Sequence, residues 1–222
     1  MAFAASFRGL QATVQLNKEY YKSSACIPAF VVLLATSDNP TVGHFQRLTW
    51  KKKIIASQVR QLSAVELRKR VEHKSGFLWT SLDKLQRDEI KAKLPEVIVA
   101  EPQFVVFEII SVHVVHFSFR KLVRHSSARV VAAIAAIEFQ DGTWPELLPF
   151  LHRSCTSSNV SHREVGSYIL FTVLENIVAG FQEHLDNLFK LFEQLLHDPE
   201  SEEVQIVTVR LVDTFRTHFP GH

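Results

Sequence analysis

The chain contains 222 residues, 46% of them hydrophobic, and its 25 Lys and Arg residues nearly balance its 23 Asp and Glu residues. A chain of this length can bury a sizeable core, and the balanced charge argues against a general affinity for polyanions. Cys26 and Cys155 are the two cysteines and lie far apart, so we expect buried thiols in a reducing compartment rather than a disulfide framework. No charged segment followed by an apolar run opens the chain, so we expect no secretory signal peptide.

The predicted elements are almost all helices separated by polar turns. Pro28 falls in the first turn of one helix, where a missing N–H costs little, and Ser37–Pro40 predicts the end of that helix. Ser81 or Asp83 is placed to cap a later helix. In chain order, the predicted helices are Leu10–Lys22, Ala25–Thr36, Val59–Val71, Leu82–Val99, Leu122–Glu138, Trp144–Cys155, His162–Val178, His184–His197 and Val204–Thr217.

A repeated pattern organises these helices. An arginine recurs at Arg60, Arg124 and Arg163, and Gln205 takes its place in a fourth copy. In each copy a small residue follows three positions later, and these residues are Ser63, Ser127, Gly166 and Thr208. The intervals from Arg124 to Arg163 and from Arg163 to Gln205 lie near the HEAT and armadillo period of about 40–47 residues. The pattern predicts an all-α fold, a HEAT-repeat (armadillo-like) α-solenoid of about four helix pairs that forms a single array.

Two stretches interrupt this repeat. We expect Thr41–Gln58 and Gln103–Lys121 to be irregular insertions into turns that are short in the later repeats. The second stretch alternates like a strand, and its apolar run is too short and too polar for a transmembrane helix. Our hypothesis is that both are retained introns in a partial gene model that also ends early. The alternative is that they are genuine loop insertions, which long solenoid turns tolerate.

Few residues suggest chemistry of their own. His113 and His116 have a spacing seen in metal sites, but no third ligand is near, so we expect no metal. No Gly-rich phosphate loop or nucleophile–base pair stands out, so we expect neither a cofactor nor enzyme activity. The basic run Arg68–Arg70 is interpreted as a cationic helix C-terminus, which the helix dipole favours, rather than as a nucleic-acid site.

Six motifs in succession carry a family resemblance. They are QLNKEYYKSSACIPAF, VRQLSAVELRKRV, SGFLWTSL, IKAKLPEVI, LVRHSSARVVAAIAAIE and WPELLPFLHRSCTSSNVSHREVGSYILFTVLENI. Together they resemble the N-terminal HEAT repeats of importin-β family karyopherins, in particular the fungal importin subunit beta-4 type. On this resemblance, residues from about 10 to 100 form the importin N-terminal region and residues from about 122 to 217 form further HEAT repeats.

The resemblance implies a nuclear transport receptor that shuttles between cytoplasm and nucleus and is not an enzyme. It implies binding to the small GTPase Ran in its GTP form, to protein cargo with basic nuclear localisation signals, and to nucleoporins through repeats beyond this chain. We expect a monomer without direct contact to nucleic acid or membrane. Two alternatives stay open, a HEAT-repeat interaction scaffold not regulated by Ran and an inactive truncated gene model.

Two sets of residues are candidates for different roles. The recurring Arg60, Arg124 and Arg163 are expected to be structural, because an arginine there can reach the preceding turn's carbonyls or an acid of the adjacent repeat. Partner contacts are expected from inner-helix side chains on the concave surface of the solenoid. The candidates for Ran or cargo binding are Glu66, Arg70, Arg129, Glu175 and Asn176.

Overall fold

The computed structural model describes residues 19–36, 46–99, 110–139, 142–177, 181 and 184–218. Within these ranges every regular element is a helix and no strand occurs, which confirms the all-α solenoid class. In chain order, the elements are η1 (Tyr20–Lys22), α2 (Cys26–Thr36), α3 (Gln46–Glu72), α4 (Phe77–Thr80), α5 (Lys84–Val99), α6 (Ile110–Glu138), α7 (Leu147–Cys155), α8 (Val160–Ile177), α9 (Leu185–Leu196) and α10 (Glu202–His218).

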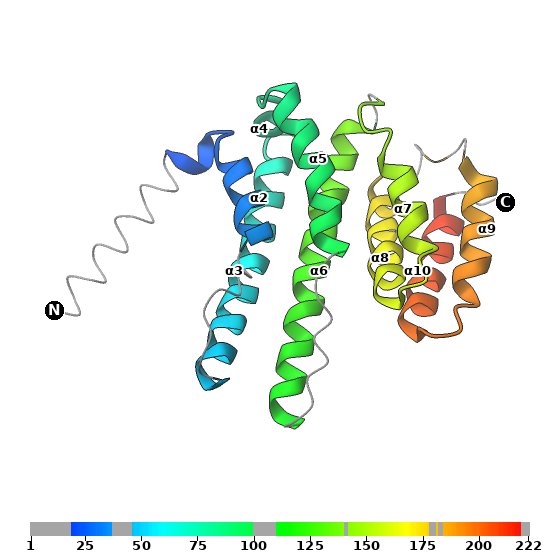
Figure 1. Ribbon diagram of the computed structural model, residues 1–222. Coiled ribbons are helices and arrows are strands. Elements are labelled where there is room, and N and C mark those ends of the chain that lie inside the picture. Colours follow the sequence, from blue (N-terminus) through cyan, green and yellow to red (C-terminus); the bar gives the residue numbers. More distant parts are fainter. Residues whose placement is uncertain are drawn as a thin grey trace.

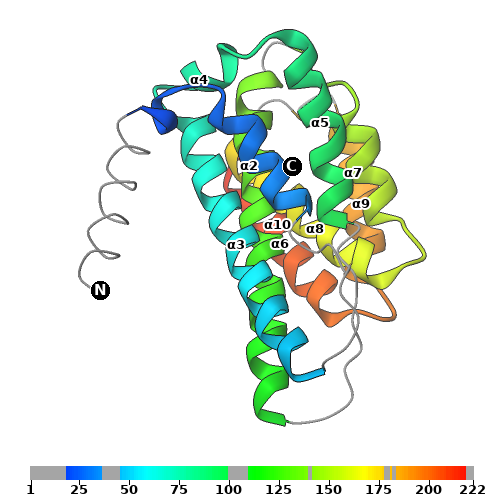
Figure 2. The same ribbon diagram turned by 60° about the vertical axis from the view of Figure 1, so that its left-hand side comes forward.

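The helices form consecutive pairs that stack in chain order, as Figure 1 shows. The second helix of each pair, α3, α6, α8 or α10, packs against the second helix of the next pair and forms an inner layer. The first helices, α2, α5, α7 and α9, form an outer layer, in which α2 contacts α5 and α7 contacts α9. Figure 2 shows α5, α7 and α9 on one side of the stack, with α3 and α6 on the other.

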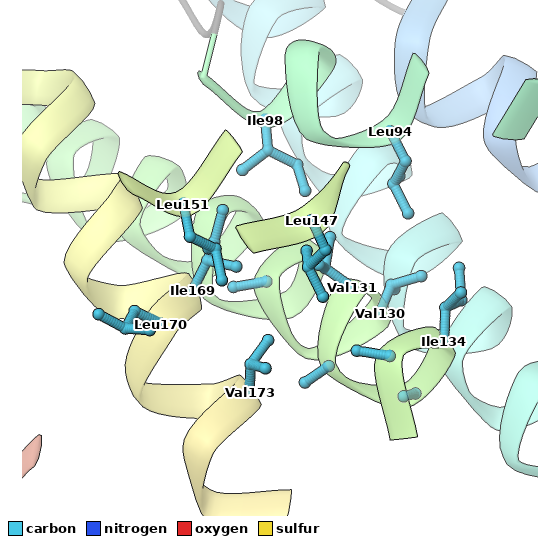
Figure 3. Packing of buried hydrophobic residues seen from close by; sticks show 14 of the residues in the cluster. Leu94, Ile98, Val130, Val131, Ile134, Leu147, Leu151, Ile169, Leu170 and Val173 are labelled. Carbon is cyan, nitrogen blue, oxygen red and sulfur yellow. The ribbon is translucent and has the colours of Figure 1, made fainter. Parts of the chain in front are cut away.

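One continuous core lies between the two layers, and Figure 3 shows its central part. Leu94 and Ile98 of α5 and Leu147 and Leu151 of α7 are buried against the inner helices. Ile134 of α6 is fully buried there too. Removing such a side chain from water contributes about 1.5–3 kcal/mol to folding. Since α6 is rich in alanine, its neighbours α3, α5 and α8 can all approach it closely.

The boundaries of several helices follow from capping and turn residues in the sequence. The Asp83 carboxylate accepts a hydrogen bond of 2.8 Å from the backbone N–H of Gln86, which confirms it as the cap of α5. The break before α4 contains the left-handed residues Lys74, Ser75 and Gly76, with φ values of 48°, 57° and 90°. Glycine is favoured at the third of them, because residues with a side chain rarely adopt a φ of 90°.

The strand-like interpretation of Gln103–Lys121 was wrong for its described part, since α6 begins at Ile110 and is helical throughout. Similarly, α3 begins at Gln46, so most of Thr41–Gln58 is helix. The physical reason is that neither helix contains a glycine or proline, and a helix propagates cooperatively until something stops it. Whether the two stretches are foreign to the family stays a prediction.

The extra residues lengthen α3 and α6 by equal amounts. Helix α3 runs from Gln46 before it reaches Arg60, and α6 runs over the same length from Ile110 before it reaches Arg124. By contrast, α8 and α10 reach Arg163 and Gln205 within their first turns. The expected position at the start of an inner helix therefore holds only for the later two copies. Figure 1 shows the N-terminal parts of α3 and α6 extending beyond α8 and α10.

One further predicted helix, Leu10–Lys22, lies mostly outside the described residues. Its last three residues form the short helix η1.

Candidate functional site

The recurring arginine of α8 joins two turns of the solenoid. The Arg163 guanidinium donates hydrogen bonds of 2.9 and 3.2 Å to the carbonyls of Ser157 and Ser158, in the turn before its own helix. It also donates to both carboxylate oxygens of Asp198 and, at 2.8 Å, to Glu200, both in the turn before α10. Arg163 and Asp198 are buried, with exposed fractions of 8% and 4%. One side chain therefore fixes the positions of two consecutive turns relative to one helix.

This pairing changes the protonation of both groups. Hydrogen bonds from Arg163 hold the pKa of Asp198 below its ordinary value, although burial acts in the opposite direction. The backbone N–H groups of Glu200 and Ser201 also donate to the Asp198 carboxylate and act in the same direction as Arg163. The two carboxylates in turn raise the pKa of Arg163 further above its ordinary value. The pair is therefore ionised at neutral pH.

The same repeat position makes related contacts in the other copies. Arg60 donates from Nε to the carbonyl of Leu34, at 3.1 Å, near the end of the preceding helix α2. Arg124 donates to the hydroxyl of Ser161 at 2.8 Å and lies 3.8 Å from the carboxylate of Glu164, both on α8. Gln205 donates to the carbonyl of Asp198 at 2.7 Å, in the turn that Arg163 also holds. We call Arg60, Arg124, Arg163 and Gln205 the ladder.

The small residue three positions after each ladder residue is buried. A Cβ on Gly166 would lie 2.7 Å from the Cβ of Ser154 and 2.9 Å from the backbone N of Cys155, both on α7. In two of the copies that carry a hydroxyl, the side chain turns back on its own helix. Ser63 and Thr208 each donate to the carbonyl four residues earlier, at 2.7 Å. At Gly166, the close approach of α7 and α8 therefore favours a residue without a side chain.

A second buried network was missed by the sequence analysis. Glu138, with an exposed fraction of 2%, accepts hydrogen bonds from the indole N–H of Trp79 at 2.7 Å and from Arg87 at 3.0 Å. It also accepts from the Lys91 ammonium at 2.9 Å and the Thr143 hydroxyl at 2.6 Å. Burial disfavours the charged carboxylate, yet hydrogen bonds from Thr143, Lys91 and Trp79 hold the pKa of Glu138 below its ordinary value. The available signal was Trp79, whose N–H requires an acceptor when buried.

Three of the five predicted partner-binding residues meet in one place. Arg129 of α6 and Glu175 and Asn176 of α8 line a polar cavity of about 230 Å³ on the inner layer. The cavity is lined by residues of α3, α6 and α8. The remaining lining residues are Arg68, Glu72, Ala132, Ala133 and Thr172. We call this cavity, with these eight residues, the polar hollow.

The other two predicted residues, Glu66 and Arg70, do not join the hollow. Arg70 forms an ion pair of 3.0 Å with Glu66 on the same helix, and its guanidinium lies 4.5 Å above the ring of Tyr21. Glu72, which was missed, takes part in the hollow instead. The repeat register could have found it, because Glu72 follows the ladder arginine of α3 at the same spacing as Glu175 follows that of α8.

The described residues show no arrangement suited to metal chemistry, since no group of three potential His, Cys, Asp or Glu ligands comes together among them. Cys26 and Cys155 are both fully buried, as expected, and burial raises the pKa of the Cys155 thiol to about 12. The thiol is therefore protonated at neutral pH and unsuited to nucleophilic attack. Among the described helices, none combines the length and the apolar character needed to span a bilayer.

Comparisons with known proteins agree with this architecture. A family model described as IPO5-like, TPR repeats matches residues 120–219, which include three of the four copies of the repeat. The chain is 29% identical over 181 residues to the probable importin subunit beta-4 of Schizosaccharomyces pombe, covering 81% of this chain and 13% of that protein. It is 30% identical over 95 residues to the probable importin-5 homolog of Dictyostelium discoideum, covering 42% of this chain and 9% of that protein.

A mouse relative extends the similarity over more of the chain. Importin-4 of Mus musculus is 26% identical over 200 residues, covering 90% of this chain and 15% of that protein. The chain thus spans less than a sixth of the length of these relatives. The observed repeat spacing, the ladder and the two helical layers fit the same kind of protein. The chain is therefore similar to importin-β family karyopherins over most of its length.

Proposed function

We propose that this protein acts in nuclear transport as a receptor that binds the small GTPase Ran in its GTP form and carries protein cargo with basic nuclear localisation signals. The observation that supports this most is the similarity to importins over 81% and 90% of the chain. On this proposal the protein moves between cytoplasm and nucleus and contacts nucleoporins on the way.

The inner layer is the surface that we assign to Ran and cargo. On this surface, polar side chains from three successive inner helices line the hollow. By contrast, the space between the inner and outer helices is filled by the apolar core. Glu175 offers an exposed carboxylate that suits a basic cargo segment, whereas the exposed carboxylate of Glu72 already forms an ion pair with Arg68. Glu66 and Arg70 stay in the proposal as part of the same layer, although their mutual ion pair must open or shift before either contacts a partner.

The proposed mechanism is that Ran-GTP and cargo bind the curved array in mutually exclusive ways. Such coupling requires that each ligand has a different affinity for two shapes of the solenoid, and it must be reciprocal. Helix pairs that meet through a shared layer can change their relative angles by small amounts at each step along the array. On this proposal, the hydrogen bonds of the ladder and of the Glu138 network stay formed while these angles change.

The test is binding of the purified chain to immobilised Ran locked with GTP and, in parallel, to Ran loaded with GDP. The expected result is retention on the GTP form only, with release of a basic cargo peptide when Ran-GTP is added. Equal binding to both forms, or to neither, would contradict the proposal, and a HEAT-repeat scaffold not regulated by Ran would take its place. Size-exclusion chromatography of the same sample separates this result from inactive, aggregated protein.

A further inference from the structure

We infer that the polar hollow binds a protein segment that presents one carboxylate and one cation, with the carboxylate on Arg129 and the cation near Glu175. The inference rests on the proposed function and deepens it by naming the chemistry of the partner at this part of the inner layer. It starts from the lining of the hollow, which holds two arginines and two glutamates.

The first step is to ask which of these charges are already neutralised. Arg68 Nε and Glu72 Oε1 lie 3.9 Å apart on the same helix, so these two side chains form an ion pair with one another. Arg129 and Glu175 have no hydrogen bond or ion pair to any residue in the part of the chain that the structure describes, and both are exposed. One positive and one negative charge are therefore left, on neighbouring helices α6 and α8.

The second step concerns space. Ala132 and Ala133 lie in the hollow beside Arg129 and leave room that longer side chains would fill. The hollow is open to solvent, and its volume of about 230 Å³ is enough for the ends of side chains from a partner. Asn176 donates from its amide nitrogen to the carbonyl of Thr172 at 2.6 Å, so its own carbonyl oxygen is left to accept a hydrogen bond. The hollow thus offers donors on α6 and acceptors on α8.

The third step excludes other ligands. A polyanion such as nucleic acid requires a surplus of cations, and the two glutamates remove it here. A metal ion requires several converging ligands, and the described residues contain no group of three. An apolar ligand does not suit a lining made mostly of charged and polar groups. A segment with charges of both signs can pair with Arg129 and with Glu175 at the same time. Electrostatic complementarity of this kind contributes to the choice of partner.

The first experiment reverses each charge in the full chain and measures affinity for Ran-GTP. Arg129→Glu and Glu175→Arg are each expected to weaken binding at least tenfold. The matched controls are Arg153→Glu on α7 and Glu193→Arg on α9, which carry the same changes on exposed outer-layer residues and are expected to leave the affinity within twofold. If wild type binds Ran-GTP and the hollow variants bind equally well, the inference is overturned while the proposed function stands.

A second experiment keeps the inference testable if wild type does not bind Ran. The probe is the blocked peptide Glu-Ala-Ala-Ala-Lys, compared with peptides of the same length that carry two Glu or two Lys. The mixed peptide is expected to shift the backbone NMR signals of Ala132, Ala133 and Thr172 at least threefold more than either uniform peptide. Arg129→Glu should abolish that difference. Equal shifts for all three peptides, or none at these residues, would overturn the inference.

Discussion

The ladder and the polar hollow both place arginines on the inner helices, yet they differ in how the charges of these arginines are satisfied. Arg163 in the ladder is buried and bound within the chain to two turns and two carboxylates. Arg129 in the hollow is exposed and has no partner within the described residues. An arginine that is saturated inside the protein stabilises the fold, whereas an unpaired one is available to a second molecule.

The substitution Arg163→Ala should have the largest effect. It leaves the buried Asp198 carboxylate without its cation, and breaking a buried ion pair on one side destabilises by about 3–5 kcal/mol. The measurement is the free energy of unfolding from urea titration followed by circular dichroism. Arg153→Ala, on the exposed face of α7, is the control and should change the free energy of unfolding little. A loss below about 1 kcal/mol for Arg163→Ala would show that the ladder does not hold the turns.

The substitution Gly166→Ala should have a smaller effect, because it adds a single methyl group where α7 and α8 touch. A Cβ there would lie 2.9 Å from the backbone N of Cys155, and backbone moves less readily than a side chain. We expect a loss of about 1–3 kcal/mol in the free energy of unfolding, the usual range for overpacking. Ser127→Ala, at the equivalent position of the preceding repeat, is the control and should cost less. Equal losses for the two would refute a special close approach at Gly166.

Acidification should weaken the two buried carboxylate sites. The pKa of Glu138 is lowered from an unfolded value of 4.5, so its contribution to stability is complete above that pH and is lost as the pH falls further. The pKa of Asp198 is likewise lowered, from an unfolded value of 3.8, so its contribution to stability is also lost as the pH falls. Urea midpoints measured from neutral pH to below the unfolded pKa of Asp198 should therefore fall, and Glu138→Gln should reduce that dependence. An unchanged pH dependence in the variant would show that the Glu138 network does not contribute to it.

The substitution Arg129→Ala should have the smallest effect on stability, within about 0.5 kcal/mol, because the side chain is exposed and makes no contact that the fold requires. The same titration used for Arg163→Ala measures it. A loss comparable to that of the ladder variant would remove the distinction between the two regions, since Arg129 would then be structural as well.

Much of the fold could be predicted because one repeated arginine fixed the register of the inner helices. The spacing of Arg124, Arg163 and Gln205 identified α6, α8 and α10 as successive inner helices, and the predicted ends of all three lie close to the observed ones. The starts of α3 and α6 were missed, the latter because alternating β-branched residues favour a strand locally. Periodicity within a short window does not show that a helix formed further along will extend backwards through such a stretch.

The hollow was predicted in part, for a related reason. Helical position alone identified exposed residues such as Arg129, Glu175 and Asn176, and these come together. The same reasoning placed Glu66 and Arg70 with them, although Tyr21 and their mutual ion pair hold those side chains elsewhere. Contacts between residues distant in sequence, such as Trp79 with Glu138, follow from how helices stack, and no local pattern encodes them.

The position of the ladder along α8 also has a mechanical consequence. Arg163 anchors this helix near its first turn, while Asn176 lies near the other end of the helix, at the far wall of the hollow. At a rise of about 1.5 Å per residue, the distance between them is a lever arm of about 20 Å, so a tilt of about 5° around the anchored end would displace the far wall by about 1.7 Å. A small tilt of α8 thus moves the residues at the hollow much more than it moves the anchored turns. The width of the hollow should therefore change with the curvature of the solenoid.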